Sequence, residues 1–594
     1  MKIYGFLTSV FISSLAHAEL VRPLPLAPED QASTKFTLQV DGKDIPVAFG
    51  TFNGEKSFHH ASFEMKGKTE LKVAINGASS KLVVRPTRHQ LASGDGQTTF
   101  SINEPLKLVV ETEGERPFFI FALPPEGNVP SPKDPNVIYF GPGLHEPGAI
   151  RPKSGQTVYL AAGAKVKGTI YTFEADGVTV RGRGVLDAQK KTSAAKKIHA
   201  LLFERSKNLK LEGIQVRAGN WWQCHFHLSD HIRVDHVQMM SFGVNNDGID
   251  IDGVTDIAVR DSFIGCGDDG FGWHAIDAVA YGEPPTRDCL AERCVIWNEH
   301  AGNGLRLGAS LETRVFENIT FRDIDVLHVR GNGFAIMADH SDWAHLRNVL
   351  FERFHNESDQ RLMDLKIGKT IYTNNTGYRD ERGTISDFYF HQVTSDRPGI
   401  RLEGAGSENA ISDLWFVDCS QAGQPLKIAK TGPYVKGIHF PDKLPERKVH
   451  PIEKIETRSP ESLLIDDGDS DFAAFGGKEM QVISNVPGAE NGNTHQFRIL
   501  GAARAAAYTP RLSGKYEISV HWGEHTGLGT KAPWTVHHTT GYTTKVFNQN
   551  KSTGWHSLGE FELDGESWVR LADPHYRISD GAVVADAVRF TKVK

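Results

Sequence analysis

Apolar and polar residues alternate in short runs along most of the chain, and few segments place apolar residues at the i, i+3, i+4, i+7 spacing of a helix. Between residues 34 and 125 these runs follow one another about every 8–12 residues, the spacing typical of a β-sandwich. Phe36–Val40 and Leu71–Ile75 are examples. The pattern predicts an N-terminal β-sandwich over residues 19–130, followed by a proline-rich linker.

The pattern changes into a repeat from Val137 onward. Strand-like runs then start mostly at intervals of about 20 to 33 residues, and similar phrases begin at Asn208, Asn318 and Asn348. Several short strands per repeat and no helix predict a β-solenoid over residues 131–455, in which each coil buries its inward side chains against the next. A sandwich with fortuitous strand spacing is the alternative.

Alternation of the first kind returns near the C-terminus. A polar stretch at residues 441–451 precedes it, and the alternating runs predict a third β domain over residues 462–594. Gly accounts for 58 of the 594 residues, which suits a turn-rich β protein. We therefore expect an all-β chain with three domains.

The N-terminus has the pattern of an export signal. Lys2 supplies a positive charge, an apolar run follows, and Ala16-His17-Ala18 forms a small-x-small cleavage site. We expect a signal peptide at residues 1–18, cleaved after Ala18, and hence a secreted or periplasmic protein; a buried strand is the alternative. No other apolar run approaches the length of a membrane span.

Charge and cysteine content narrow the range of partners. The formal net charge is -7 and there is no basic cluster, so we expect no nucleic-acid partner. The cysteines are odd in number and lack C-x-x-C spacing, which argues against a zinc site or a disulfide framework. We expect no cofactor and no bound metal. Buried free thiols are the favoured state of the five, although the third and fourth could pair: Cys224, Cys266, Cys289, Cys294 and Cys419.

Two acidic turns lie one solenoid coil apart. Asp247 precedes Asp268 by 21 residues and Asp269 by 22, so the carboxyl groups should stack on adjacent coils, about 4.8 Å apart at the backbone. Splayed side chains would reach the roughly 6.5–9.5 Å at which an inverting glycosidase seats a water, and crowding raises the pKa of at least one acid. Simple Asp-Gly turns and a calcium site are alternatives, but the acidic segments lack EF-hand spacing.

These residues carry a resemblance to a known enzyme class. Asn245-Asn246-Asp247 followed one coil later by Asp268-Asp269 resembles the acidic motif of the polygalacturonase-like glycoside hydrolases, family 28, and the solenoid is similar to that of the related family 49 dextranases. The resemblance implies a right-handed parallel β-helix flanked by the two β-sandwiches. It also implies that Asp268 is the general acid, and that Asp247 and Asp269 hold and deprotonate the attacking water.

Two motifs depart from the family 28 pattern. Asn303 stands where the family has the His of a Gly-His-Gly block, and Ala335 and Met337 stand where it has the basic residues of Arg-Ile-Lys. In pectinases those basic residues bind the galacturonate carboxylate. The departures favour a neutral sugar, or an acidic one that other residues recognise, and the preceding β domain resembles the dextranase architecture.

The C-terminal domain has a resemblance of its own. Residues 532–538, 554–559 and 583–588 resemble the golvesin-type, xanthan-lyase-associated β-sandwich, which implies a role in glycan binding or anchoring. Trp522, Trp534 and Trp555 are candidate stacking platforms, but in a β-sandwich such residues are more often part of the core.

A groove for a sugar chain needs aromatic faces and polar edges. The candidates for substrate binding are Trp222, Trp273, His274, Asn303 and Arg306. We therefore predict a secreted, inverting glycoside hydrolase acting on a polysaccharide or oligosaccharide. A β-helix polysaccharide lyase and a non-catalytic glycan-binding or adhesin protein are the alternatives; a lyase would need a metal, Arg or Lys to neutralise a uronate carboxylate.

Overall fold

The computed structural model describes residues 20–594, except for 53–55, 78–79, 190–197, 218, 220, 277, 279–282, 369–381, 429, 451–455, 476–479, 500–504 and 573–579. The predicted signal peptide lies outside the described residues. The described part is built almost entirely from β-strands, with two short 3-10 helices at Thr87–His89 and Glu490–Gly492. In that part, no helix combines the length and the apolar character needed to cross a membrane.

The N-terminal unit consists of residues 1–51 and 57–131 and contains two sheets around one core. Phe36, Leu38, Phe63 and Phe118 point into that core because alternate residues of each strand face it. One sheet has four strands, in the order β10 (Gln97–Ile102), β7 (Thr69–Ile75), β3 (Phe36–Val40) and β4 (Lys43–Ile45). The other has eight: β1 (Leu20–Pro23), β2 (Gln31–Ala32), β5 (Ala48–Phe52), β6 (Lys56–Lys66), β8 (Lys81–Arg85), β9 (Gly94–Asp95), β11 (Lys107–Glu111) and β12 (Phe118–Leu123).

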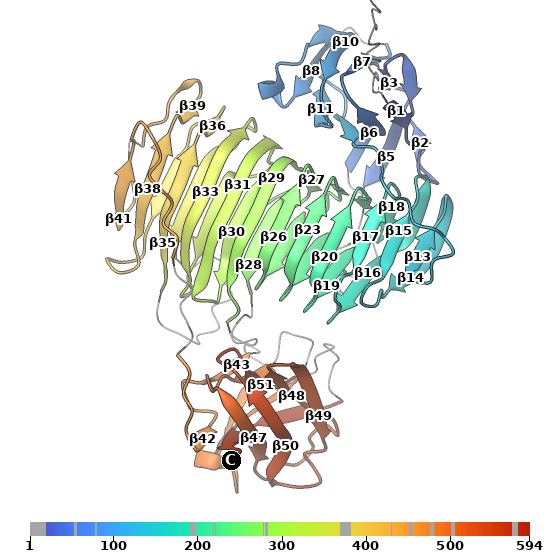
Figure 1. The fold of residues 1–594 in the computed structure, drawn as a ribbon. Helices are drawn as coiled ribbons and strands as arrows, with labels where there is room; N and C mark the ends of the chain where they lie inside the picture. Colours follow the sequence, from blue (N-terminus) through green and yellow to red (C-terminus); the bar gives the residue numbers. More distant parts are fainter. Residues whose placement is uncertain are drawn as a thin grey trace, which may run out of the picture. The chain divides into compact units, whose positions relative to one another are not determined.

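The central part of the chain is a parallel β-helix (Figure 1). Its strands pair with strands one coil earlier and one coil later, and almost all of these pairings are parallel. The strands are β13 (Val137–Phe140), β14 (Gly143–Ile150), β15 (Thr157–Leu160), β16 (Ala164–Phe173), β17 (Thr179–Gly182), β18 (Val185–Asp187), β19 (Leu201–Glu204), β20 (Lys207–Glu212), β21 (Gln215–Arg217), β22 (Cys224–His227), β23 (Asp230–Asp235), β24 (Gln238–Met240), β25 (Ile249–Asp252), β26 (Thr255–Arg260), β27 (Phe263–Cys266), β28 (Phe271–Ala275), β29 (Thr286–Asn298), β30 (Leu305–Leu311), β31 (Val315–His328), β32 (Phe334–His340), β33 (His345–Asn356), β34 (Arg361–Ile367), β35 (Thr384–His391), β36 (Thr394–Ser395), β37 (Ile400–Glu403), β38 (Ile411–Val417), β39 (Ser420–Gln421), β40 (Gln424–Pro425) and β41 (Val435–His439).

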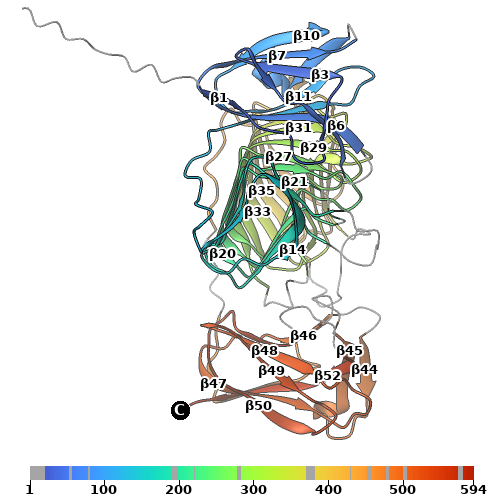
Figure 2. The same ribbon diagram turned by 90° about the vertical axis from the view of Figure 1, so that its right-hand side faces the viewer.

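One face of the β-helix, here called the site ladder, carries the predicted catalytic aspartates at the starts of its strands. It consists of β16, β19, β22, β25, β28, β30, β32, β34 and β37, each hydrogen-bonded to the next. The faces of the β-helix enclose one interior (Figure 2). This interior is apolar, because every second side chain of each strand points inward. Rings stack there along the axis, as in Phe321–Phe351 and Phe351–Phe390, whose centroids are 5.3 Å and 5.1 Å apart.

The repeated asparagines mark a fixed corner of the coil. Asn208, Asn318 and Asn348 all have a positive φ, between 54° and 56°. Asp256 and Asp288 adopt the same left-handed backbone at the corresponding place in other coils. Asn and Asp tolerate this conformation better than other residues with a side chain, which explains the recurring phrase in the sequence.

The C-terminal part has its own core and three sheets. Trp522 and Trp534 are fully buried in it, so they are core residues rather than platforms. Trp555 is half-buried beneath the Arg589 guanidinium, 4.1 Å from the ring centroid. The strands are β42 (Ser462–Ile465), β43 (Phe472–Phe475), β44 (Gln481–Ser484), β45 (Asn493–Arg498), β46 (Ala505–Tyr508), β47 (Gly514–Trp522), β48 (Ala532–His538), β49 (Gly541–Phe547), β50 (Gly554–Leu563), β51 (Trp568–Leu571), β52 (Ala582–Ala585) and β53 (Ala587–Lys592).

The predicted fold class, a parallel β-helix with a β-sandwich before it and another after it in the chain, is confirmed. All five cysteines are free thiols, four of them buried and Cys419 half-buried.

Candidate active site

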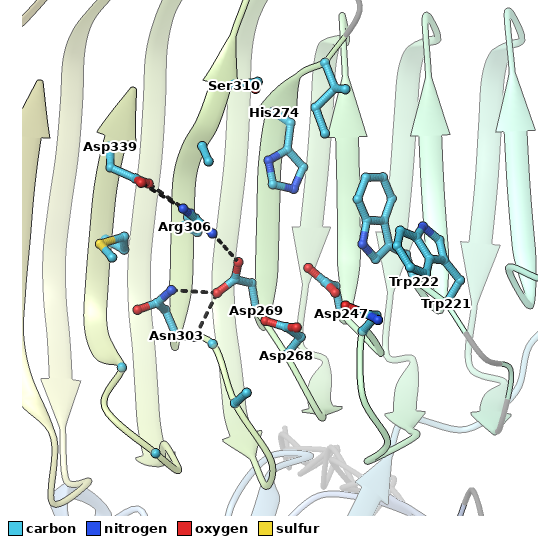
Figure 3. Close-up of a pocket in the computed structure, with 18 of the residues that line it drawn as sticks. Trp221, Trp222, Asp247, Asp268, Asp269, His274, Asn303, Arg306, Ser310 and Asp339 are labelled. Carbon is cyan, nitrogen blue, oxygen red and sulfur yellow. Dashed lines mark hydrogen bonds and ion pairs between the residues drawn. The ribbon is translucent and has the colours of Figure 1, made fainter. Parts of the chain in front are cut away.

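The three predicted catalytic aspartates meet just before the N-terminal ends of β25 and β28, in the middle of the site ladder. Ile249 pairs with Phe271, and Phe271 pairs with Leu305. Two residues before each of these lie Asp247, Asp269 and Asn303, which therefore occupy the same position in three consecutive coils (Figure 3). A spacing of about one coil along the chain thus brings the carboxyl groups of Asp247 and Asp269 side by side.

Glycines keep the three coils close together at this corner. The residues after Asp247, Asp269 and Asn303 are Gly248, Gly270 and Gly304. A Cβ atom on Gly248 would collide with the carbonyl oxygen of Gly270, and one on Gly270 with that of Gly304. Glycine is therefore required by close backbone approach, and this approach sets the carboxyl separation.

Single oxygens of the three aspartates lie close together. One oxygen from each of Asp247, Asp268 and Asp269 lies within 4.8 Å of the others. One water with two hydrogen bonds of about 2.7 Å each bridges acceptors up to about 5.4 Å apart, so two of these carboxyls are close enough to hold a single water.

Asp269 is held by a fixed set of donors. Its Oδ1 accepts hydrogen bonds from the backbone N–H of Asn303 at 2.8 Å and from the Asn303 Nδ2 amide at 2.7 Å. Arg306 lies 3.8 Å from its Oδ2. Burial raises the pKa of Asp269, and Arg306 and Asn303 oppose this rise.

Asp268 has fewer supporting contacts and is more exposed than its neighbour. Burial raises its pKa to about 7, and the charge of Asp269 adds to this effect. Asp247 is 4% exposed, and burial followed by the charges of Asp268 and Asp269 raises its pKa well above the ordinary value. The three carboxyl groups therefore hold their protons to higher pH than free aspartates do, and because their charges interact they titrate as one group.

Asn303 and Arg306 point toward acidic side chains. The side-chain oxygen Oδ1 of Asn303 accepts a hydrogen bond from the Phe334 backbone N–H at 3.0 Å. This bond orients the side-chain amide N–H of Asn303 toward Asp269. Arg306 forms a two-point ion pair with Asp339, at 2.9 Å and 2.7 Å. Both residues line the pocket, and their side chains hydrogen-bond to the carboxyl groups of Asp269 and Asp339.

The aspartates open into a pocket of about 580 Å³ (Figure 3). Among the other lining residues, Trp221 and Trp222 come from an earlier coil, and Asn332, Met337 and Asp339 from a later one. Trp222 stacks on His274 with ring centroids 5.4 Å apart, so both predicted residues form one side of the pocket. Trp221, one coil before Asp247, was not selected as a binding residue from the sequence, and Asp339 was not considered; the register of the site ladder is the signal that places both here.

Trp273 is not part of the pocket, and its predicted role in substrate binding is wrong. It is fully buried in the β-helix interior, 4.7 Å from the ring of Phe321. The reason is the two-residue period of strand β28: Phe271 and Trp273 face inward, while His274 faces the pocket. Proximity to the acidic pair in sequence therefore did not bring Trp273 to the site.

A second polar layer lies beneath the pocket. His225 Nε2 is 2.9 Å from Asp252 Oδ2, and the Ile276 N–H donates to the same carboxyl group at 2.7 Å. Burial lowers the pKa of His225 to about 3 and raises that of Asp252 to about 6. Asp250, which lies two residues before Asp252 on β25 and pairs in register with His225 of β22, is fully buried, and neither carboxyl oxygen has a hydrogen-bond partner among the described residues.

Comparison with known proteins gives similarities to solved structures but none to curated sequences. No curated protein matches the chain. The protein titled Dex49A from Penicillium minioluteum is 15% identical, with a TM-score of 0.48, 70% of this chain covered and 96% of that one. A family 28 exopolygalacturonase from Yersinia enterocolitica is 13% identical, with a TM-score of 0.39 and coverage of 71% and 96%.

Two further matches cover smaller shares of the chain. A Paenibacillus xanthan lyase is 22% identical over 23% of this chain, with a TM-score of 0.20, and the chain spans 13% of that lyase's length. The family described as Golvesin C-terminal domain matches residues 465–592. The resemblance to polygalacturonase-like β-helix proteins, with a golvesin-type domain at the C-terminus, is therefore confirmed.

Proposed function

We propose that the protein is a glycoside hydrolase that cleaves glycosidic bonds of a polysaccharide or oligosaccharide. The observation that carries this proposal is the arrangement of three carboxyl groups, on adjacent coils, at the base of an open pocket. Asp268 is half-buried and lines the pocket, while Asp247 and Asp269 are almost fully buried. Acid and base roles need different environments of this kind.

Asp268 is the general acid in this mechanism. With a pKa of about 7, it carries a proton in a large fraction of molecules near neutral pH and donates it to the glycosidic oxygen. Asp269 accepts two hydrogen bonds from Asn303, which favour its ionised form. Together with Asp247 it holds and deprotonates a water that attacks the anomeric carbon from the opposite face, with inversion of configuration.

The charge in the pocket favours a neutral sugar. Its lining includes four aspartates, at positions 247, 268, 269 and 339, against one arginine. That arginine, Arg306, is bound to Asp339 and lies close to Asp269. A uronate carboxylate would enter an acidic site with no available cation in the described lining, so polygalacturonate is a poor substrate.

Two alternatives make different predictions. A lyase needs a cation to neutralise the uronate carboxylate and would release unsaturated products. A glycan-binding or adhesin protein would need none of the acid–base chemistry, so Asp268→Asn would leave its binding unchanged. The predicted signal peptide supports secretion or periplasmic export, and the golvesin-type domain is proposed to bind glycan.

The test is release of reducing ends from a panel of neutral, sulfated and uronate glycans. The control variant is Asp364→Asn, which removes another buried carboxyl of the site ladder, on β34, outside the pocket lining. We expect cleavage of a neutral glycan that is lost in Asp268→Asn and kept in Asp364→Asn. Equal activity in Asp268→Asn and the parent would contradict the assignment. No cleavage across the panel, with binding on a glycan array, would favour the binding protein.

A further inference from the structure

Three polar atoms converge on the surface of Gly272, and one of them belongs to Asp247 of the proposed catalytic group. A Cβ atom at Gly272 would lie 2.8 Å from His274 Nε2 and 3.2 Å from Asp247 Oδ2, and it would collide with Asp250 Oδ1. The ligand atoms of these three residues all lie within 4.8 Å of one another. The absence of a side chain at Gly272 leaves this space to the three groups.

The carboxyl group of Asp250 is buried without hydrogen-bond partners among the described residues. The Nε2 atom of the His274 imidazole lies 3.5 Å from Asp250 Oδ1. A buried carboxyl without partners is costly, and the cost falls when a cation lies between it and its neighbours.

Arg306, the neighbouring cation, forms its ion pairs with carboxyl groups outside this cluster. Arg306 is held by Asp339 at 2.7 Å and lies on the other side of Asp269. Asp252, the next outward residue of β25, is paired with His225. Asp247 and Asp250 thus face His274, and among the described residues neither carboxyl group forms an ion pair with Lys or Arg; Arg306 acts on Asp247 only as a more distant charge.

We propose that Asp247, Asp250 and His274 form a binding site for a divalent transition-metal cation of the Mn²⁺ or Zn²⁺ type. Two carboxylate oxygens and one imidazole nitrogen are ligands that suit these ions, whereas Ca²⁺ and Mg²⁺ prefer oxygen alone. Both ring nitrogens of His274 are buried and without a hydrogen-bond partner among the described residues, so its Nε2 is available as a ligand. No linear motif announces the site, because its ligands come from two coils.

The ion would compete with catalysis rather than serve it. This consequence rests on the proposed function, in which Asp247 helps to hold the attacking water. An oxygen of Asp247 that coordinates a cation is a weaker base and is withdrawn from that water. Saturation with the ion should therefore slow hydrolysis, and removal of the ion by a chelator should restore it.

The binding test is independent of hydrolysis. The purified full-length protein, freed of metal by chelator, is titrated with Mn²⁺ while free Mn²⁺ is followed by its EPR signal, and Zn²⁺ is added in competition. We expect one site per chain in the parent protein. In Asp250→Asn and His274→Gln the affinity should fall by about 100-fold or more, because loss of a direct ligand costs more than the roughly 10- to 100-fold that loss of an outer partner costs.

Asp364→Asn is the matched control, because Asp364 is also a buried carboxyl of the site ladder but is paired with Arg401. It should bind Mn²⁺ as the parent does, and circular dichroism and the unfolding midpoint check that each variant is folded. Failure of the parent to bind either ion, or equal affinity in a folded Asp250→Asn, would overturn the proposal. If the parent binds Mn²⁺ but the metal-free protein hydrolyses no glycan, the result would contradict the proposed function and leave the metal site supported.

Discussion

Asp268 and Asp269 are adjacent in the chain, yet their carboxyl groups lie in different surroundings. Asp269 accepts two hydrogen bonds from Asn303 and is 3% exposed, whereas Asp268 reaches the pocket with fewer contacts. Consecutive residues at a strand corner point in different directions, so a single dipeptide supplies both a proton donor and a water-binding group. This division is the chemical core of the proposed mechanism.

The first prediction concerns the alkaline side of the pH–rate profile. The folded-state pKa of Asp268 is raised to about 7, so its proton is present below that pH and lost as the pH rises through it. Hydrolysis should decline above pH 7, approaching about tenfold per pH unit. Initial rates between pH 4 and 9 test this, and a rate that stays constant to pH 9 would exclude Asp268 as the acid.

The second prediction concerns Asn303 as a positioning residue. Asn303→Ala removes the Nδ2 donor to Asp269, so the pKa of Asp269 rises and the acidic limb of the pH profile moves to higher pH. We expect kcat to fall by about tenfold or more, with KM changed by less than about threefold. Asn332→Ala, at the exposed rim of the pocket, is the control. A large rise in KM alone would instead indicate direct sugar binding.

At the residue scale, the sequence predicted the carboxyls but not their partners. The 21- and 22-residue spacings placed Asp247 one coil from Asp268 and Asp269, because the coil length was visible in the repeat. Asp339 was missed because its link to Arg306 depends on the register between β30 and β32. Trp273 was misplaced because its neighbours in sequence gave no information on which face of β28 it occupies.

The elements of the β-helix derive their stability from stacking along its axis. Phe351 lies between Phe321 and Phe390, with centroid distances of 5.3 Å and 5.1 Å. Phe390 continues the row to Phe416 at 4.6 Å. Each ring is covered by the coils before and after it, so a cavity in the middle of the row cannot be filled by a shift of one side chain.

The third prediction follows from this row. Phe351→Ala should lower the free energy of unfolding by about 3–5 kcal/mol, the range for deleting a fully buried aromatic side chain. Phe440→Ala is the control, because Phe440 stacks on Phe416 at the end of the row but is 54% exposed. Denaturant unfolding followed by circular dichroism measures both. Equal losses would show that the interior row does not carry the stability of the β-helix.

At the element scale, the period of the repeat was predictable and the details of each coil were not. The asparagine phrases reported a backbone corner with positive φ, which is a local property of the sequence. The register between coils depends on contacts between residues more than 20 positions apart, and no local pattern specifies these. The parallel β-helix could thus be predicted, while the composition of the site ladder needed the structure.

On the scale of the whole molecule, the chain combines a β-helix with the active site and β domains before and after it. The acidic site is a local cost to stability within this framework. Asp247, Asp250, Asp252 and Asp268 all have pKa values raised first by burial, so in the folded protein each resists ionisation. Functional sites of this kind are maintained by stability elsewhere in the fold.

The fourth prediction is that Asp268→Asn stabilises the protein. Because the folded-state pKa of Asp268 is about 7 and the unfolded value is near 3.8, its ionisation increasingly opposes folding as the pH rises between these values. The gain should be near zero at pH 4 and about 1–4 kcal/mol at pH 8. Unfolding of the variant and parent at both pH values measures it. A variant less stable than the parent at pH 8 would show that Asp268 contributes to stability through a contact.

The most direct test of the central claim is the proton NMR spectrum of the first product formed from a cleaved glycan. Recorded before mutarotation, it shows the anomeric configuration of the new reducing end. The three-aspartate mechanism predicts the inverted anomer, formed in a single displacement by the water between Asp247 and Asp269. A retained anomer would contradict the water-holding role of that pair, and a vinyl proton from an unsaturated sugar would show that the enzyme is a lyase.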